Sequence, residues 1–305
     1  MTREELNQDK QKEVMSETRY ENRKKMVIFS FKIIGCIVLL FLLFYLYTTF
    51  ISTKIVSVRE YRVINKKVPS EFNGIKVVQF SDLHYGSTIF INDLKKIVNK
   101  INELKPDLVV FTGDLIDQNY SLTIKEQEEI SKALLKIDTT LGKYAVRGDE
   151  DTDVFSIVMN QSEFNILDNG YDFIYNESST PIILFGSASY LQNESNIKNT
   201  FAYFEDATHN TNIFSISLVH EPDVVEDIQK NYFVDVILAG HSHNGNVRIP
   251  FIGPVSKVSG ANKYYDAYYQ LDDTKLYISS GLGTNGAGLR LFCRPSISLF
   301  RISNK

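Results

Sequence analysis

The sequence has few cysteines and no surplus of positive charge. Cys36 and Cys293 are the two cysteines among 305 residues, which excludes a disulfide framework and a thiolate metal site. The formal net charge is -4, so the chain lacks the electrostatic signature of a nucleic-acid-binding protein. Internal repeats and low-complexity segments are also absent from the sequence. With 43% hydrophobic and 23% charged residues, the composition is ordinary for a globular protein.

Charge is also nearly missing from residues 26–51. Lys32 is the one charged residue in this stretch, and an aromatic cluster closes it. As a helix, these residues would span about 39 Å, which exceeds the roughly 30 Å of a bilayer's hydrocarbon core. A buried core helix is a poor alternative, because such a helix rarely lacks a polar face over this length. We therefore predict a polar tail over 1–25, a transmembrane anchor over 26–51, and a juxtamembrane segment with the first strand over 52–74.

The residues around the anchor predict its fate and its orientation. No small-x-small cleavage signature follows the apolar run, so we expect the anchor to be retained. The flank before it carries four basic residues, Arg19, Arg23, Lys24 and Lys25, which favours a cytoplasmic amino terminus. The bias is modest because basic residues also follow the anchor. The prediction is a single-pass protein of the cell membrane with its large domain on the extracytoplasmic side.

Beyond the anchor, apolar runs of strand length alternate with segments of helical periodicity. Strand-like runs occupy residues 55–64, 75–80, 107–112, 141–146, 182–185, 212–219 and 234–239. Helices are expected from a cap at Asn92 to Leu104, from the capping box Thr123-x-x-Glu126 to Ile137, at 197–205 and at 224–229. The tail from Tyr264 suits a second, partly antiparallel sheet with strands near 276–279 and 297–302. This order predicts one α/β domain over roughly 55–305, with ligands beyond the carboxyl ends of its strands.

Acids and histidines follow several of these strands. The run 77–80 breaks into Ser81-Asp82-Leu83-His84, and the two-residue alternation of an extended chain would place Asp82 and His84 on one side. Carboxylates mixed with neutral imidazoles suit zinc, manganese or iron. Singly, each such residue is more often a capping or hydrogen-bonded loop residue. Together they predict a metal centre with the candidate ligands Asp82, His84, Asp114, Asp149, His220, His241 and His243. The fifth histidine, His209, stands between polar residues and is expected at the surface.

The spacing of these residues resembles a known signature. The series Asp82-x-His84, Gly113-Asp114, Gly148-Asp149-Glu150, His220 and Gly240-His241-x-His243 is similar to that of calcineurin-like metallophosphoesterases. The closing stretch, from Tyr277 to Gly283 and from Arg290 to Pro295, resembles the membrane-anchored bacterial phosphodiesterase branch of that superfamily. The resemblance implies a four-layer α/β/β/α sandwich of two mixed sheets over residues 75–305.

The resemblance also implies a phosphoester hydrolase with two divalent metal ions, which would be manganese, iron or zinc. Asp82, His84 and His243 would hold the first ion, Asp149, His220 and His241 the second, and Asp114 would bridge them. A hydroxide shared by ions about 3.5–4 Å apart would attack phosphorus. The branch points to a phosphodiesterase acting on a lipid-linked, cell-wall-derived or nucleotide-derived phosphoester. From position alone, Asn244 and Arg290 are candidate substrate contacts.

Two residues depart from the family pattern, which has Gly-Asn-His followed by an acid where this chain has Gly148-Asp149-Glu150-Asp151. Asp149 can ligate through oxygen, but it lowers the net charge of the centre from about +2 to about +1 and weakens its attraction for phosphate. Glu150 replaces a histidine expected to act as general acid, and an ionised carboxylate there would repel the substrate. We predict reduced activity, with Asp149 and Glu150 in the catalytic site. The competing hypothesis is a metal-binding receptor or scaffold that has lost catalysis, and a protein phosphatase is a weaker third.

Two further motif matches are rejected. Gly281-x-Gly283-x-x-Gly286 fits the dinucleotide-binding pattern, but glycine and proline follow where that pattern needs a helix. A glycine turn beside the metal centre is predicted instead. Arg147-Gly148-Asp149 spells a cell-adhesion tripeptide, yet its aspartate belongs to the predicted metal centre.

Overall fold

The computed structural model describes residues 3–177, 179–206, 212–286 and 288–305. His209, expected at the surface, lies outside these ranges. The chain divides into two compact units, Met1–Thr48 and Thr49–Lys305, each of which we describe by itself.

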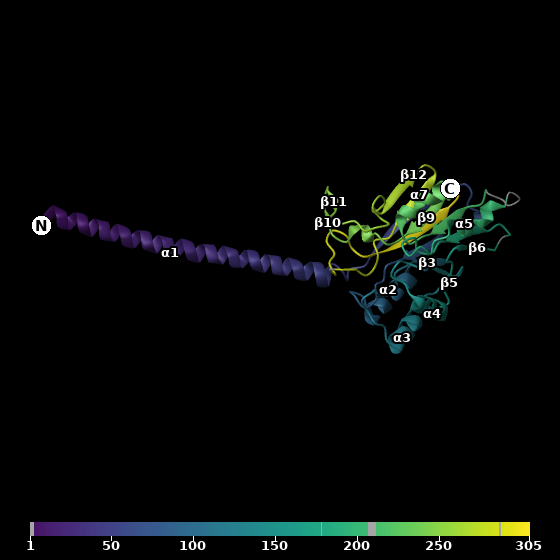
Figure 1. Cartoon of the computed structure of the whole chain (residues 1–305), viewed down its shortest axis with the longest axis horizontal. Coiled ribbons are helices and arrows are strands. Elements are labelled where there is room, and N and C mark those ends of the chain that lie inside the picture. Colours follow the sequence, from purple (N-terminus) through teal and green to yellow (C-terminus); the bar gives the residue numbers. More distant parts are fainter. Residues whose placement is uncertain (1–2, 178, 207–211, 287) are drawn as a thin grey trace. The chain divides into compact units, whose positions relative to one another are not determined.

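The first unit is one long helix, α1 (Arg3–Leu46), and a π-helical turn at Tyr47–Ile51 follows it into the second unit. The predicted polar tail and the predicted anchor are therefore parts of one element, because no proline interrupts the helix (Figure 1). Within the described residues, the segment Lys10–Ile51 is long and apolar enough to cross a membrane, judged by length and composition. Its most apolar window has no buried residues.

The second unit contains two six-stranded sheets. The first has the order β1-β14-β2-β3-β4-β5, in which β14 runs parallel to β1 and antiparallel to β2, and β2 to β5 are parallel. Its strands are β1 (Ser57–Ile64), β2 (Ile75–Phe80), β3 (Leu108–Thr112), β4 (Lys143–Val146), β5 (Asn165–Ile166) and β14 (Ser296–Ser303).

The second sheet has the order β12-β13-β9-β8-β7-β6. Its four central strands are parallel, and β12 and β6 are antiparallel edges. The strands are β6 (Gly170–Ile174), β7 (Ile182–Gly186), β8 (Ser215–Leu218), β9 (Val236–Ala239), β12 (Tyr268–Leu271) and β13 (Thr274–Ile278). Between β9 and β12 the chain forms a small hairpin from β10 (Arg248–Ile249) and β11 (Gly253–Pro254).

The placement of β14 corrects the prediction that residues 297–302 belong to the second sheet. Ile297 packs into the cluster beneath the helices of the first sheet, whereas Phe300 packs between the two sheets. A strand that is buried on both faces needs an interior position, and β14 finds it between β1 and β2. Local alternation alone could not choose between the two sheets.

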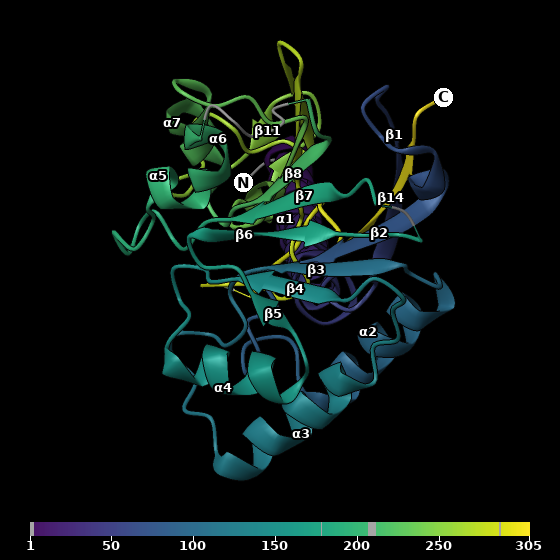
Figure 2. The same ribbon diagram turned by 90° about the vertical axis from the view of Figure 1, so that its right-hand side faces the viewer.

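Three apolar clusters separate four layers, as predicted. One lies between the first sheet and the helices α2 (Ile91–Glu103), α3 (Ile124–Leu135) and α4 (Asp153–Gln161), and a second lies between the sheets. The third lies between the second sheet and the short helices α5 (Ile197–Thr200), α6 (Ala202–Glu205) and α7 (Val225–Gln229). Figure 2 shows α2, α3 and α4 along one face of the sandwich. The result is an α/β/β/α sandwich.

The helix ends test the predicted caps. The capping box of α3 is confirmed, because the Thr123 hydroxyl accepts from the Glu126 amide and the Glu126 carboxylate accepts from the Thr123 amide. The cap predicted at Asn92 is wrong, since α2 begins at Ile91 and the Asp93 carboxylate accepts from the Phe90 amide. The single helix expected over 197–205 is two short helices, and α4 and β6 were not predicted.

The carboxyl ends of the central strands of both sheets meet at one place. The side-chain amide of Gln79, near the end of β2, donates to the Ala239 carbonyl at the end of β9 over 2.9 Å. Just beyond these strands, the His241 amide donates to Oδ1 of Asp82 over 2.8 Å. Loops that follow strands of different sheets are therefore in direct contact, and the predicted ligands lie on these loops.

Candidate metal centre

The seven candidate ligands gather in two groups. The first group contains Asp82, His84 and His243, and the second group contains Asp114, Asp149, His220 and His241. Within each group the potential ligand atoms lie within 4.8 Å of one another. Oδ2 of Asp114 links the groups, because it lies 3.2 Å from Nε2 of His220 and 3.6 Å from Nε2 of His84. The structure thus brings together all seven residues in the grouping that the resemblance implied.

The backbone that presents these residues is unusual. Asp82 (φ 51°), His84 (φ 40°), Asp114 (φ 60°), His241 (φ 65°) and His243 (φ 47°) all adopt left-handed conformations. Such conformations cost about 1–3 kcal/mol each for a non-glycine residue, and they cluster at functional sites. The convergence of Asp82 and His84 was therefore predicted for the wrong reason, since both residues lie in left-handed turns beyond β2 and not in an extended strand.

Glycines allow the loops to approach the acids and imidazoles closely. A Cβ atom on Gly148 would lie less than 3.0 Å from Oδ1 of Asp114, and one on Gly281 would lie 2.7 Å from Nδ1 of His243. Gly281 also has a φ of +67°. The segment that matched the dinucleotide-binding pattern is thus a glycine turn packed against the metal-centre candidates.

Hydrogen bonds fix the orientation of two imidazoles. Nδ1–H of His220 donates to the Thr112 carbonyl over 2.7 Å, which leaves the lone pair of Nε2 facing the cluster. Nε2–H of His241 donates to the Ser259 carbonyl over 2.6 Å and leaves Nδ1 free in the same way. Each free nitrogen is the one that lies near Asp149.

The electrostatics of the site favour bound cations. Burial and the charge of Asp114 raise the pKa of Asp82, whose buried Oδ2 has no hydrogen-bond partner in the described part of the chain. Burial would also raise the pKa of Asp149, but when His220 and His241 are protonated, their hydrogen bonds to its carboxylate outweigh burial and lower that pKa. A buried oxygen without a donor is costly, and a divalent cation held by carboxylates and imidazoles would satisfy it. The residues present therefore fit a metal centre.

A protein-family model for calcineurin-like phosphoesterases matches residues 75–245, more than half of the chain. The chain belongs to this family. The family uses divalent metals, and all seven candidate ligands lie within the matched residues.

Relatives of known sequence lie in bacteria and in a vertebrate. The chain is 30% identical over 265 residues to the uncharacterized metallophosphoesterase YkuE of Bacillus subtilis, and the match covers 85% of this chain and 90% of that protein. It is 25% identical to the UDP-2,3-diacylglucosamine pyrophosphatase LpxG of Chlamydia muridarum, over 77% of this chain and 86% of that protein. A transmembrane protein with metallophosphoesterase domain from Danio rerio is 25% identical, over 76% of this chain and 54% of that protein.

Glu150, which departs from the family pattern, contacts Nδ1 of His84, the ring nitrogen that faces away from Asp114. Its Oε2 accepts from Nδ1–H of His84 over 3.0 Å and from the Gln118 amide over 3.0 Å. Burial alone would lower the pKa of His84, but this hydrogen bond and the charges of Asp114, Glu150 and Asp82 raise it to about 9. Nε2 of His84 is left facing the first group.

A third set of potential ligand atoms, from His84, Asp117 and Glu150, lies beside the two groups. A neutral imidazole offers one lone pair, so His84 cannot ligate through both nitrogens. Because Nε2 of His84 faces Asp114, the third set supports the orientation of His84 and is not an equal candidate.

Arg290 and Asn244, the candidate substrate contacts, are both buried. Arg290 is fully buried, and its Nη2 donates to the Gly283 carbonyl over 2.6 Å and lies 3.2 Å from Nδ1 of His243. Asn244 is also buried; its Oδ1 accepts from Arg59 over 2.7 Å and its Nδ2 donates to the Tyr265 carbonyl over 3.1 Å. Nε of Arg290 has no hydrogen-bond partner in the described part of the chain, and a substrate contact by either residue stays a prediction.

Asp151 is a site residue that the sequence did not reveal. Its buried carboxylate accepts from the amides of Asp114 (2.9 Å), Leu115 (2.8 Å) and Gly148 (2.9 Å), and so ties the loop after β3 to the loop after β4. Burial and the charge of Asp114 raise its pKa to about 7. Nothing in the sequence Asp149-Glu150-Asp151 distinguishes a metal ligand from a residue that holds two loops together. We call this contact of Asp151 with three backbone amides the clamp.

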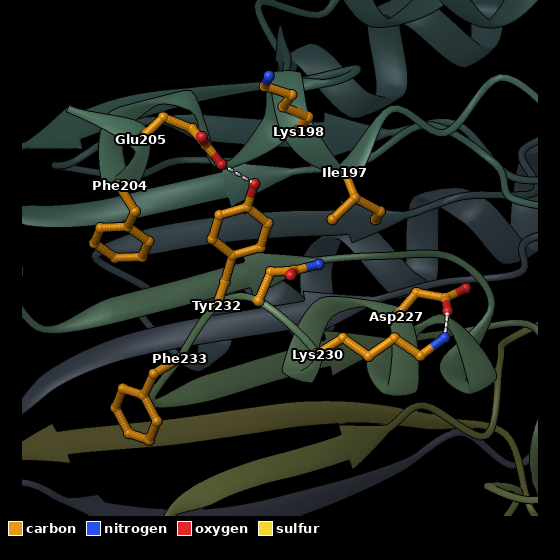
Figure 3. Close-up of a pocket in the computed structure, with 9 residues that line it drawn as sticks. Ile197, Lys198, Phe204, Glu205, Asp227, Lys230, Tyr232 and Phe233 are labelled. Atoms are coloured by element: carbon orange, nitrogen blue, oxygen red, sulfur yellow. Dashed lines mark hydrogen bonds and ion pairs between the residues drawn. The ribbon is translucent and has the colours of Figure 1, made fainter.

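A large hollow of about 870 Å³ lies elsewhere, among α5, α6 and the segment after α7 (Figure 3). Aromatic rings and paired charges line it, including Phe204, Tyr232 and Phe233, with Lys230 held by Asp227 at 2.5 Å and Tyr232 donating to Glu205. The candidate ligands of the metal centre do not contribute to this lining. The hollow is therefore separate from the candidate metal centre.

Proposed function

We propose that this chain is a membrane-anchored phosphodiesterase with a dinuclear metal centre and reduced activity. One observation carries the proposal: the Asp114 carboxylate stands between the two groups, close to Nε2 of His220 and of His84. A carboxylate in this position can serve two cations at once, which is the arrangement that two-metal phosphoester hydrolysis requires.

When bound, two divalent cations would acidify a water molecule and offset the charge that develops on the phosphoryl oxygens. The chain supplies the donor atoms and holds them in place. Thr112 and Ser259 fix the tautomers of His220 and His241, and Glu150 fixes that of His84. Asp151 keeps two of the ligand loops together. The left-handed turns preorganise the ligand side chains, because the folded protein already holds the strained backbone before substrate binds.

Reduced activity follows from the two carboxylates. Asp149 lies 3.0 Å from Nε2 of His220 and 2.9 Å from Nδ1 of His241, so its charge is added where the family pattern has a neutral amide. Glu150 adds a second negative charge behind His84. Both weaken the attraction for an anionic phosphodiester. These two residues also motivate the competing function, a metal-binding scaffold without turnover.

The membrane part of the proposal is supported by α1 and by two relatives. The segment Lys10–Ile51 has the length and apolar composition of a spanning helix, and the basic flank before it favours an extracytoplasmic domain. The Danio rerio relative is named as a transmembrane protein, and the Chlamydia relative is named for a diacylglucosamine substrate. The first name supports the anchor, and the second supports a lipid-linked phosphoester as the substrate.

Metal analysis and a phosphodiester assay test the proposal on the full-length protein in detergent. We expect bound manganese, iron or zinc, and hydrolysis of bis(p-nitrophenyl) phosphate that is lost in Asp114→Asn. The control is Asp138→Asn, which changes an exposed acid and should behave as wild type. Metal without turnover in the wild type would support the scaffold instead. Absence of both would overturn the metal centre.

A further inference from the structure

The β10–β11 hairpin exposes large apolar side chains. Phe251 is fully exposed, Ile252 is 78% exposed and Val255 is 63% exposed. Phe292, on a neighbouring loop, is 68% exposed. Scattered single apolar residues are normal on a surface, but a contiguous group of this kind marks an interaction site. Ile249, Phe251, Ile252 and Phe292 are contiguous because they line one hollow of about 470 Å³, and Val255 directly follows β11 of the same hairpin.

Backbone hydrogen bonds join the hairpin to the loop that carries Phe292. The Arg248 amide donates to the Leu291 carbonyl over 2.9 Å, and Val247 forms a bridge with Leu291. The exposed side chains therefore stand on a pair of braced segments and not on separate loose loops. We refer to Ile249, Phe251, Ile252, Val255 and Phe292 as the apolar tip.

The apolar tip lies next to the metal centre. The hairpin begins five residues beyond His243, and Arg248 donates to the Asn244 carbonyl over 2.9 Å. Cys293, the neighbour of Phe292, contacts the His243 carbonyl through Sγ at 3.1 Å. Whatever binds the tip is thus brought close to the first group of candidate ligands.

The tip also lies at the end of the domain where the chain arrives from its apolar helix. Ser57, at the start of β1, donates its amide to the Pro295 carbonyl over 2.8 Å, and Pro295 stands three residues after Phe292. Ser57 is only six residues beyond Ile51, the last residue of the apolar segment. The chain itself therefore tethers this end of the domain close to any bilayer that holds α1.

The chemistry of the segment suits a bilayer surface better than a protein groove. Residues 245–258 contain no acid. Arg248 is paired with Asp266 over 2.6 Å, whereas Lys257, two residues beyond Val255, places an exposed cation beside the apolar side chains. Aromatic and aliphatic residues with flanking cations are typical of interfacial membrane contacts, where the apolar groups enter the acyl region and the cations meet lipid phosphates. Tethering raises the local concentration of the surface, so a small tip suffices.

We propose that the apolar tip inserts into the surface of the lipid bilayer and presents the metal centre to phosphoesters of membrane lipids. The second half of this inference rests on the proposed phosphodiesterase function, whereas the first half does not. The substrate class is then an amphipathic phosphodiester whose reacting phosphorus lies at headgroup depth.

Tryptophan fluorescence tests the insertion directly, because the sequence contains no tryptophan. The full-length Phe251→Trp variant would be reconstituted in vesicles of brominated phosphatidylcholine and phosphatidylglycerol. We expect blue-shifted emission that the bromines quench, relative to unbrominated vesicles. Tyr175→Trp, at an exposed position beyond β6, is the matched control and should not be quenched. Emission from the Phe251→Trp variant that is indifferent to bromine, whether the indole is exposed or covered by a protein, would overturn the insertion.

A pair of substrates with one leaving group tests the presentation of lipids. Both bis(p-nitrophenyl) phosphate in solution and the p-nitrophenyl phosphodiester of diacylglycerol in vesicles release p-nitrophenolate as water adds to phosphorus. In a Phe251→Ser, Ile252→Ser double variant, we expect the ratio of lipid to soluble turnover to fall at least several-fold. An unchanged ratio would overturn the presentation of lipids. If the wild type hydrolyses neither substrate, the proposed function fails, and the quenching experiment still decides the insertion.

Discussion

Nδ1 of His84 donates a 3.0 Å hydrogen bond to Oε2 of Glu150, the residue that stands where the family pattern has a histidine. The bond gives Glu150 a structural task that its position in the sequence did not suggest. It holds His84 in the tautomer whose Nε2 faces the first group of candidate ligands. The same carboxylate contributes negative charge near the place where an anionic substrate would bind. Structural support and electrostatic cost therefore come from one side chain.

Two substitutions at Glu150 separate these effects. Glu150→Gln keeps an oxygen that accepts from His84 and removes the charge, so we expect unchanged metal content and several-fold higher kcat/KM for bis(p-nitrophenyl) phosphate. Glu150→Ala removes the acceptor, so metal affinity should fall roughly 10–100-fold. Glu128→Gln, at an exposed position on α3, is the control. A glutamine variant with equal or lower kcat/KM would contradict the electrostatic account.

The clamp formed by Asp151 predicts a loss of stability. Asp151→Ala leaves three buried amides without their acceptor, and each unsatisfied donor costs about 1–3 kcal/mol. We expect a decrease of at least about 3 kcal/mol in the free energy of unfolding, measured by urea denaturation, with weaker metal binding. Asp153→Ala, which removes an exposed acid from the first turn of α4, should cost less than about 1 kcal/mol. Equal effects of the two substitutions would show that the clamp adds little.

Gly148 predicts a steric effect on metal loading. In Gly148→Ala, the new Cβ would lie less than 3.0 Å from Oδ1 of Asp114, so the Asp114 carboxylate or the loop after β4 must move. We expect metal content, measured by plasma mass spectrometry, to fall well below that of wild type. Gly170→Ala is the control, because a Cβ there would meet nothing within 4 Å. Full metal loading in the Gly148 variant would mean that the site tolerates the shift.

The raised pKa values predict how metal removal changes the pH dependence of stability. The pKa of His84 rises from 6.5 to about 9, and those of His220 and His241 are also raised, because nearby carboxylates outweigh burial. Without metal, these protonated imidazoles stabilise the fold fully below about pH 6.5, and that contribution is lost as the pH rises to about 9. Bound metal replaces the protons. We expect the Tm of the chelator-treated protein to fall over this range and that of the manganese-loaded protein to fall less. Parallel Tm curves would contradict this expectation.

Much of the fold and of the site follows from residues that are close in sequence. The apolar runs before Asp82, Asp114 and His241 predict strands, and parallel strands bring their carboxyl ends together. The layer order needed the resemblance, because periodicity identifies elements but not their neighbours. The position of β14 depends on contacts with β1 and β2 that lie over 200 residues away in sequence. Local pattern could not supply them.

The supporting groups around the ligands were harder to predict. Arg290 was a candidate substrate contact on position alone, and the sequence does not show that its guanidinium is buried. Asp151 looked like one more acid in an acidic run, and its role emerges only when three backbone amides point at it. The distinction between ligand and support is a matter of hydrogen-bond geometry, and the sequence carries no signal for that geometry.

β14 follows every other strand of the first sheet in the sequence, yet it lies between two of the earliest ones. It stands between β1, which directly follows the apolar segment, and β2, which leads into Asp82. During synthesis, β1 and β2 therefore lack their shared neighbour until β14 has been made. The first sheet and the candidate ligands beyond its strands must wait for β14, so a chain truncated before Ser296 should lack a functional site.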